Sequence, residues 1–147
     1  GQNDTVCDNV LAARLGSTPG SRWLHISQHR NDIDSGHMLV WGDVYIDQKF
    51  KGIAGRIADY DGFICDLIEE EYGIAVSEIQ QTIRPITIPD KICVEMKVPN
   101  QSLGLEMTRR YLNHLKHPVE VSINIFPAAR SAYTITLSRT QERARDR

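Results

Sequence analysis

Strict alternation of apolar and polar residues between Val119 and Ile125 is the strongest structural signal in this chain. Valine or isoleucine occupies every odd position, whereas Glu120, Ser122 and Asn124 occupy the even positions. A period of two is typical of a β-strand that packs one face against a core. A solvated strand face would give the same pattern. If the outer face has a function, it presents a carboxylate, a hydroxyl and an amide about 7 Å apart as candidate ligand-binding groups.

An earlier part of the chain repeats this design. Residues 15–26 align with residues 96–107, and each segment combines a helix end, a proline-containing turn and a strand. In both halves a polar turn and an apolar strand follow, at 40–46 in the first half and 119–125 in the second. Because an isolated hairpin is only marginally stable in water, the repetition predicts two related hairpin units that build one sheet.

The remaining signals predict an α+β domain. Capping residues and apolar periodicity indicate helices at about 8–15, 48–58, 63–72 and 89–96. Apolar and β-branched runs indicate strands at about 23–30, 38–46, 74–88, 103–111, 119–125 and 132–138. Pro85 indicates that the strand at 74–88 lies at a sheet edge or contains a bulge. This order of elements predicts helices packed on one side of a mostly antiparallel sheet.

The chain ends differ in composition from the part between them. Residues 1–5 are polar and are expected to be a loose linker remnant, whereas residues 6–139 form the predicted domain. Residues 140–147 alternate basic and acidic side chains without apolar anchors, which predicts a frayed tail. A first residue other than methionine suggests that the chain is a fragment of a longer protein.

Composition restricts the possible partners and the compartment. The 147 residues suit one domain, and a net charge of −2 provides no overall positive field for nucleic acid. Cys7, Cys65 and Cys93 form an odd set without a C-x-x-C pair, which is typical of a reducing cytoplasm. No apolar run approaches the 18 residues or so that a membrane helix needs. The sequence therefore predicts a cytoplasmic globule that contacts DNA, if at all, through another segment.

Signatures of catalysis and of cofactor binding are missing from the sequence. His25 and His29 lie on one predicted strand, about 13 Å apart, which is too far to share a metal ion. His114 and His117 flank a turn without a third ligand nearby. The chain has no nucleophile elbow, no P-loop and no dinucleotide-binding glycine motif. We therefore expect no metal, no cofactor and no catalytic residue.

Arg30 is the strongest single candidate for ligand contact. It shares a predicted strand face with Leu24 and Ile26. Because burial of an unpaired guanidinium is very costly, this side chain needs an anionic partner. That partner could be an anionic ligand, or it could be Glu120 or Asp43 in a structural ion pair.

Several motifs resemble one known family when they are taken together. They are L-G-x-x-P-G-S at 15–21, E-E-E-Y-G at 69–73, P-V-E-x-S at 118–122 and R-x-x-Y at 130–133. The chain resembles, over residues 6–139, the effector-binding (UTRA) domain of GntR-family transcription regulators of the HutC type. The resemblance implies a chorismate lyase-like fold and a cytoplasmic bacterial regulator that forms a homodimer through this domain. It also implies that a small effector controls an upstream winged-helix DNA-binding domain, which this chain lacks.

The chain departs from the family pattern at several positions. Members that bind phosphosugars have an R-x-R pair where this chain has Gln-His-Arg at 28–30. The glutamate expected on the partner strand falls at Gly42 beside Trp41, and a serine is replaced by Phe63, whereas Glu120 is retained. These changes predict an effector that is less anionic and more apolar or aromatic, such as a carboxylate, and less probable as a sugar phosphate.

The predicted effector-binding residues are Gln28, Arg30, Trp41, Asp43, Phe63, Glu120, Ser122, Asn124 and Arg130. Two alternatives remain open at this point. The chorismate lyase-like fold could host an enzyme, because fold alone does not decide function. The domain could instead be a dimerisation module whose pocket is filled by Trp41, Phe63 and their neighbours.

Overall fold

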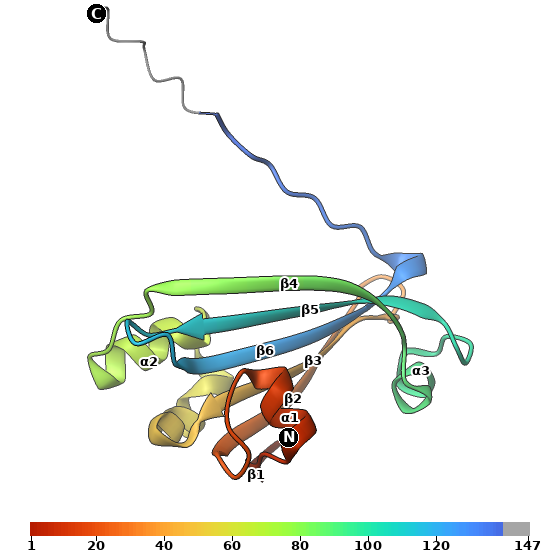
Figure 1. Ribbon diagram of the computed structural model, residues 1–147. Helices are drawn as coiled ribbons and strands as arrows, with labels where there is room; N and C mark the ends of the chain where they lie inside the picture. The colour runs from red at the N-terminus through yellow and green to blue at the C-terminus, as the bar shows by residue number, and fades with distance from the viewer. Residues whose placement is uncertain (140–147) are drawn as a thin grey trace, which may run out of the picture.

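The computed structural model describes residues 1–139. Six antiparallel strands form one sheet in the order β1-β2-β3-β6-β5-β4 (Figure 1). The strands are β1 (Gln2–Val6), β2 (Arg22–Asn31), β3 (Met38–Asp47), β4 (Glu78–Thr87), β5 (Leu103–Leu112) and β6 (Pro118–Pro127). The helices are α1 (Asn9–Leu15), the 3₁₀ helix η1 (Gln48–Asp59), α2 (Ile64–Tyr72), α3 (Asp90–Met96) and the short 3₁₀ turn η2 (Ala128–Arg130). The predicted α+β class is confirmed.

Two halves with the same local structure build this sheet. Helix α3 begins 81 residues after α1, and β5 begins 81 residues after β2. Both helices end at a residue in the left-handed conformation, Gly16 with φ 70° and Lys97 with φ 56°. In the turns that follow, Ser21 Oγ donates to Thr18 O at 2.7 Å, and the serine 81 residues later makes the equivalent bond to Pro99 O at 2.5 Å. The predicted internal repeat is therefore present, and its halves meet where β3 pairs with β6.

Local capping explains where the helices begin and end. Asp8 accepts a hydrogen bond from Leu11 N at 2.8 Å at the start of α1. Asp47 accepts one from Lys49 N at 2.9 Å at the start of η1. Helix α2 ends at Gly73, whose φ of 64° suits glycine. These three caps were predicted from the sequence, and the capping residue satisfies backbone groups that a helix end leaves free.

The two faces of the sheet carry separate cores. Trp23, Tyr45 and Ile123 point to one face, called here the α1 face, and pack with residues of α1. Helix α3 covers another part of that face through Cys93 and Met96. The opposite face, called here the α2 face, carries a core in which strand residues Leu24, Ile26, Val44 and Ile46 pack with Ile53 of η1 and Leu67 and Ile68 of α2.

Helices therefore flank both faces, which corrects the expectation that they lie on one side. The repeat explains the difference, because each half brings its own short helix to the α1 face, while the connection between the halves crosses the α2 face. The sequence pattern shows which residues of a strand share a face. It does not show which face a helix covers.

Two further expectations about the chain ends are wrong. Residues 1–5 were expected as a loose linker remnant, but residues 2–5 belong with Val6 to β1, which pairs with β2 from Val6↔Arg22 to Gln2↔Ile26. Residues 132–138, expected as a strand, form no regular structure and lead away from the sheet (Figure 1). The expected edge position of β4, which contains Pro85, is confirmed. The tail predicted at 140–147 lies outside the described residues.

Candidate effector site

A cavity of about 450 Å³ opens on the α2 face, beyond the part that η1 and α2 cover. Strands β2, β3 and β6 supply its walls. Its lining consists of Gln28, His29, Arg30, Val40, Gly42, Asn124 and Phe126. Polar and apolar side chains therefore meet in one concave site of the size that small ligands occupy.

The polar side of the cavity results from strand register. Gln28 of β2, Gly42 of β3 and Asn124 of β6 are paired across three neighbouring strands. A Cβ atom at position 42 would lie only 2.7 Å from Asn124 Oδ1 and 3.3 Å from Gln28 Cγ. Glycine at this position of β3 therefore leaves space for the amide side chains of Gln28 and Asn124 on the two flanking strands.

Arg30 supplies the positive charge of the cavity. It is exposed, and within residues 1–139 its guanidinium forms no ion pair. The two carboxylates considered as structural partners are both elsewhere, because Asp43 points to the α1 face and Glu120 lies in the covered part of the α2 face. The structural ion-pair interpretation of Arg30 is therefore wrong.

Glu120 and Ser122 are buried rather than presented on an outer face. Their exposed fractions are 4% and 8%. Glu120 pairs in register with Ile46 and Tyr111, and its Oε2 atom has no hydrogen-bond partner among the described residues. Burial, reinforced by the nearby Asp66 carboxylate, raises the pKa of Glu120 to about 8. Asn124 alone of the predicted polar row reaches the cavity.

Trp41 and Asp43 are separated from the cavity by the sheet itself. Their register partners on β6 are Ile125 and Ile123, which point to the α1 face. Trp41 packs against the core around α3. Asp43 Oδ1 lies 2.7 Å from His25 Nε2. Neither residue lines the cavity, and the prediction that Trp41 shapes it is wrong.

Phe63 and Arg130 also lie away from the cavity lining. Phe63 is the residue before α2, and 67% of it is exposed. Arg130, predicted at the start of a strand, lies in η2 and donates from Nη1 to Met38 O at 3.3 Å and to Met96 O at 3.2 Å. Its contacts tie η2 to the end of α3 and to the start of β3.

The sequence interpretation missed the apolar side of the cavity. Val40 and Phe126 supply it, in place of the two aromatic residues that were expected. Phe126 also borders a small adjacent cavity of about 30 Å³ whose lining is Ile83, Leu105, Met107, Phe126, Ser131, Ala132 and Tyr133. The signal for Phe126 was present, because it continues the even-numbered positions of β6 after Asn124.

Residues 4–132 match the family model of the UTRA domain. The chain belongs to the UTRA family. No curated protein sequence matches it. Within residues 1–139, the helices are all too short or too polar to cross a membrane.

Solved structures show the same fold at low sequence identity. A GntR-family transcriptional regulator from Bacillus cereus superimposes with a TM-score of 0.81 at 14% identity, over 94% of each chain. A GntR-family regulator from Enterococcus faecalis gives 0.78 at 13% identity, over 93% of this chain and 96% of that one. The effector domain of PhnF from Mycobacterium smegmatis gives 0.74 at 15% identity, over 95% and 84%. At this level of identity, these structures show that the chain shares their fold.

Proposed function

We propose that this UTRA domain binds a small-molecule effector in the cavity of the α2 face and belongs to a HutC-type transcription regulator of the bacterial cytoplasm. The main support is Arg30, an ion-pair donor without a protein partner among residues 1–139, beside two amide side chains and an apolar wall. DNA binding is assigned to a winged-helix domain upstream of this chain. The cavity lining combines one guanidinium, two amides and apolar side chains, a set that suits the binding of a small ligand.

The lining favours a carboxylate with an apolar body as the effector. One guanidinium, on Arg30, can hold a carboxylate with two parallel hydrogen bonds. Gln28 and Asn124 can donate further hydrogen bonds, and Phe126 offers apolar surface that continues toward the small second cavity. Glutamine at the first arginine position of the family's R-x-R pair removes one positive charge, which disfavours a doubly charged phosphate.

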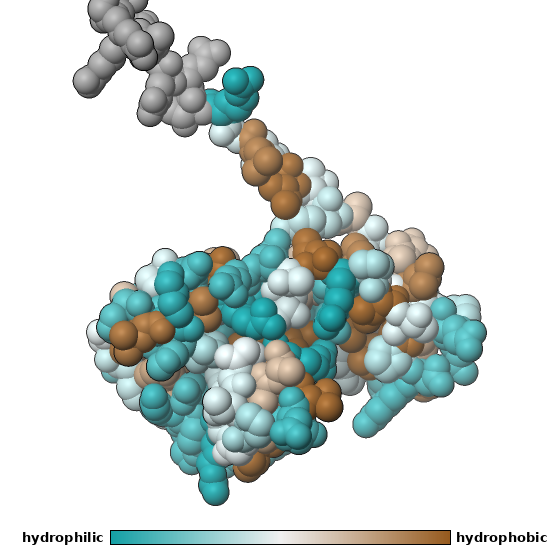
Figure 2. Space-filling view, in the orientation of Figure 1, coloured by the Kyte–Doolittle hydropathy of each residue, from teal (hydrophilic) through white to brown (hydrophobic). Residues whose placement is uncertain are grey.

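We also infer that the regulator forms a homodimer in which the segment 132–138 pairs with a second copy. Tyr133, Ile135 and Leu137 alternate with polar residues, and their exposed fractions are 42%, 59% and 87%. Figure 2 shows hydrophobic surface along the part of the chain that leaves the body. An alternating strand pattern that finds no sheet in its own described chain is a suitable donor for a sheet edge of a partner.

Effector binding would act on this dimer by favouring one arrangement of its subunits. An effector shifts such an equilibrium only if it binds one arrangement more tightly than the other. A coupling of about 1–3 kcal/mol is typical of regulatory proteins. Phe126 near the end of β6 lines the cavity and also borders the small second cavity together with Tyr133 of the exposed segment, which gives the two events a structural connection.

The test is a ligand screen on the wild-type domain and on Arg30→Gln. The panel contains aliphatic and aromatic carboxylates, amino acids and sugar phosphates, and thermal unfolding is the readout. A ligand at about 100 times its dissociation constant adds roughly 2.7 kcal/mol, which raises the melting temperature by several degrees. We expect an aromatic or aliphatic carboxylate to do so in the wild type and to lose the effect in Arg30→Gln.

Arg22→Gln is the matched control, because Arg22 is an exposed arginine on the same strand outside the cavity. It should respond to the ligand like the wild type. Binding that survives Arg30→Gln, or a panel in which no compound binds, would contradict the proposed site.

A further inference from the structure

A second cleft, of about 280 Å³, lies on the α1 face, on the opposite side of the sheet from the effector cavity. Helix α1 and strands β4 and β5 line it through Ala13, Arg14, Thr82, Arg84, Glu106, Thr108 and Arg110. Three guanidinium groups therefore line a cleft that contains one carboxylate. Nothing in the proposed effector function uses these residues.

Strand register arranges the lining in three rows. Arg84 pairs with Glu106, Thr82 pairs with Thr108, and Arg110 occupies the next row on the same face. Rows on one face of a sheet are about 7 Å apart. The two threonines therefore form a floor between an arginine at one end and Arg110 at the other.

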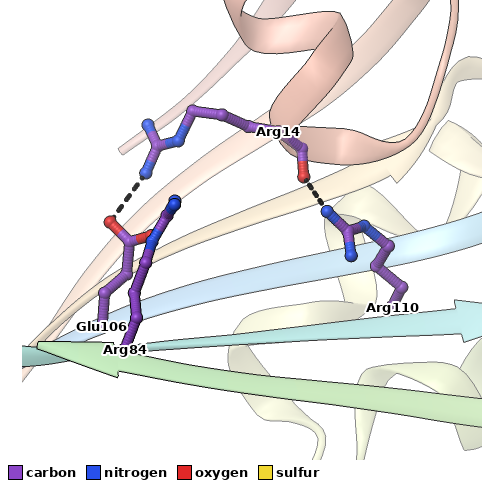
Figure 3. Close-up of polar contacts among 4 residues, drawn as sticks. All are labelled: Arg14, Arg84, Glu106 and Arg110. Carbon is purple, nitrogen blue, oxygen red and sulfur yellow. Dashed lines mark hydrogen bonds and ion pairs between the residues drawn. The ribbon is translucent and has the colours of Figure 1, made fainter.

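Arg14 spans the cleft from α1. Figure 3 shows its side chain reaching toward Glu106, while its backbone carbonyl lies beside Arg110 at the other end. Arg14 Nη2 donates to Glu106 Oε2 at 3.1 Å, and Arg110 Nη2 donates to Arg14 O at 2.8 Å. The guanidinium groups of Arg84 and Arg110 lie on either side of the space below this side chain (Figure 3).

The charges in the cleft do not balance. Glu106 is only 7% exposed and already accepts from two arginines, at 3.1 Å from Arg14 and at 2.9 Å from Arg84. Arg110 has no carboxylate partner among residues 1–139, and its Nε atom is buried without an acceptor. That Nε atom packs against Gly16 at the end of α1. An additional negative group in the cleft would balance the excess positive charge of its lining.

We propose that this cleft binds a small oxyanion, such as a phosphate or carboxylate group. Arg84 and Arg110 supply the charge from its two ends, and the hydroxyl groups of Thr82 and Thr108 supply hydrogen bonds from its floor. A bound oxyanion links β5 to the edge strand β4. The site is independent of Arg30, because the two lie on opposite faces of the sheet.

The experiment is calorimetric and thermal-shift titration of the 147-residue chain with inorganic phosphate and, separately, with acetate, at constant ionic strength set with chloride. We expect saturable binding of at least one of the two anions. The affinity should fall at least tenfold in Arg84→Gln and in Thr82→Val, and it should be unchanged in Arg30→Gln.

Both test residues lie on the edge strand and are exposed, and Glu106 keeps Arg14 in Arg84→Gln, so both variants should fold. Circular dichroism spectra recorded without the anion show whether both variants fold like the wild type. A response that rises linearly with anion concentration and is equal in all variants overturns the proposal, as does binding that only Arg30→Gln abolishes. The second outcome would assign the anion to the effector cavity.

Discussion

Glu120 is a carboxylic acid whose protonation depends strongly on its surroundings. A carboxylate that is 4% exposed and has an oxygen without a partner is disfavoured in its charged form. Its pKa of about 8 is raised first by burial and then by Asp66. Around neutral pH, this side chain is therefore mostly a neutral carboxylic acid inside the fold.

This pKa predicts a pH dependence of stability. Between about pH 4.5, the ordinary value, and pH 8, the folded state binds more protons at Glu120 than the unfolded state does. The free energy of unfolding should therefore fall as pH rises through this window, by at most about 1.4 kcal/mol per pH unit. Glu120→Gln keeps the shape without the titration, so it should be more stable than the wild type at pH 8 and lose this advantage near pH 5.

Urea denaturation of both proteins between pH 5 and pH 8 measures this difference. Glu95→Gln is the control, because Glu95 is exposed on α3 and should leave the pH profile of the wild type unchanged. Parallel pH profiles for Glu120→Gln and the wild type would show that burial does not raise the pKa of Glu120.

Sequence alternation placed Glu120, Ser122 and Asn124 on one face, and that prediction is confirmed by the register of β6. What it could not show is that η1 and α2 cover part of this face and leave another part open. Burial of a strand residue depends on elements distant in sequence. Trp41 and Asp43 were misassigned because the odd positions of β3 point to the α1 face, whereas the cavity lies on the α2 face.

Helices α1 and α3 end at corresponding residues of different types, a glycine and a lysine. Gly16 ends α1 in the left-handed conformation at no steric cost, whereas Lys97 adopts the same conformation at the end of α3 with a φ of 56°. A side chain with a Cβ atom pays about 1 kcal/mol for this conformation. Lys97→Gly should therefore raise the free energy of unfolding by about 0.5–1 kcal/mol.

Chemical denaturation of Lys97→Gly, compared with Lys91→Gly, measures this effect. Lys91 lies within α3, where glycine should lower stability by about 0.5–1 kcal/mol. A loss of stability in Lys97→Gly would mean that the lysine side chain makes a contact that outweighs the backbone strain.

Capping signals act within a few residues, which is why the helix boundaries could be predicted well from the sequence. A segment forms a β-strand only when another strand pairs with it. The sequence of the segment indicates only its own propensity for the extended conformation. The polar segment 2–6 becomes β1 by pairing with the edge of β2, whereas within residues 1–139 the apolar segment 132–138 pairs with neither edge strand of the sheet, β1 or β4.

For the whole molecule, the proposed dimer depends on the segment 132–138. Deletion of residues 132–147 should convert a dimer into a monomer in analytical ultracentrifugation, because it removes Ile135 and Leu137 together with the strand backbone. Deletion of 140–147 alone is the matched control and should leave the dimer intact. A dimer that persists without residues 132–147 would assign the interface to another surface.

The 81-residue repeat also explains why a cavity exists on the α2 face. In the first half, η1 and α2 cover Leu24, Ile26, Val44 and Ile46. The positions of β5 that correspond to Leu24 and Ile26, 81 residues later, are Leu105 and Met107, which line the smaller cavity, and Asn124 and Phe126 of the neighbouring β6 line the larger one. The duplication is incomplete, since no second pair of helices among the described residues covers these positions. An effector bound there would take the place of that absent layer, so sensing a ligand and completing a hydrophobic core would be the same physical event.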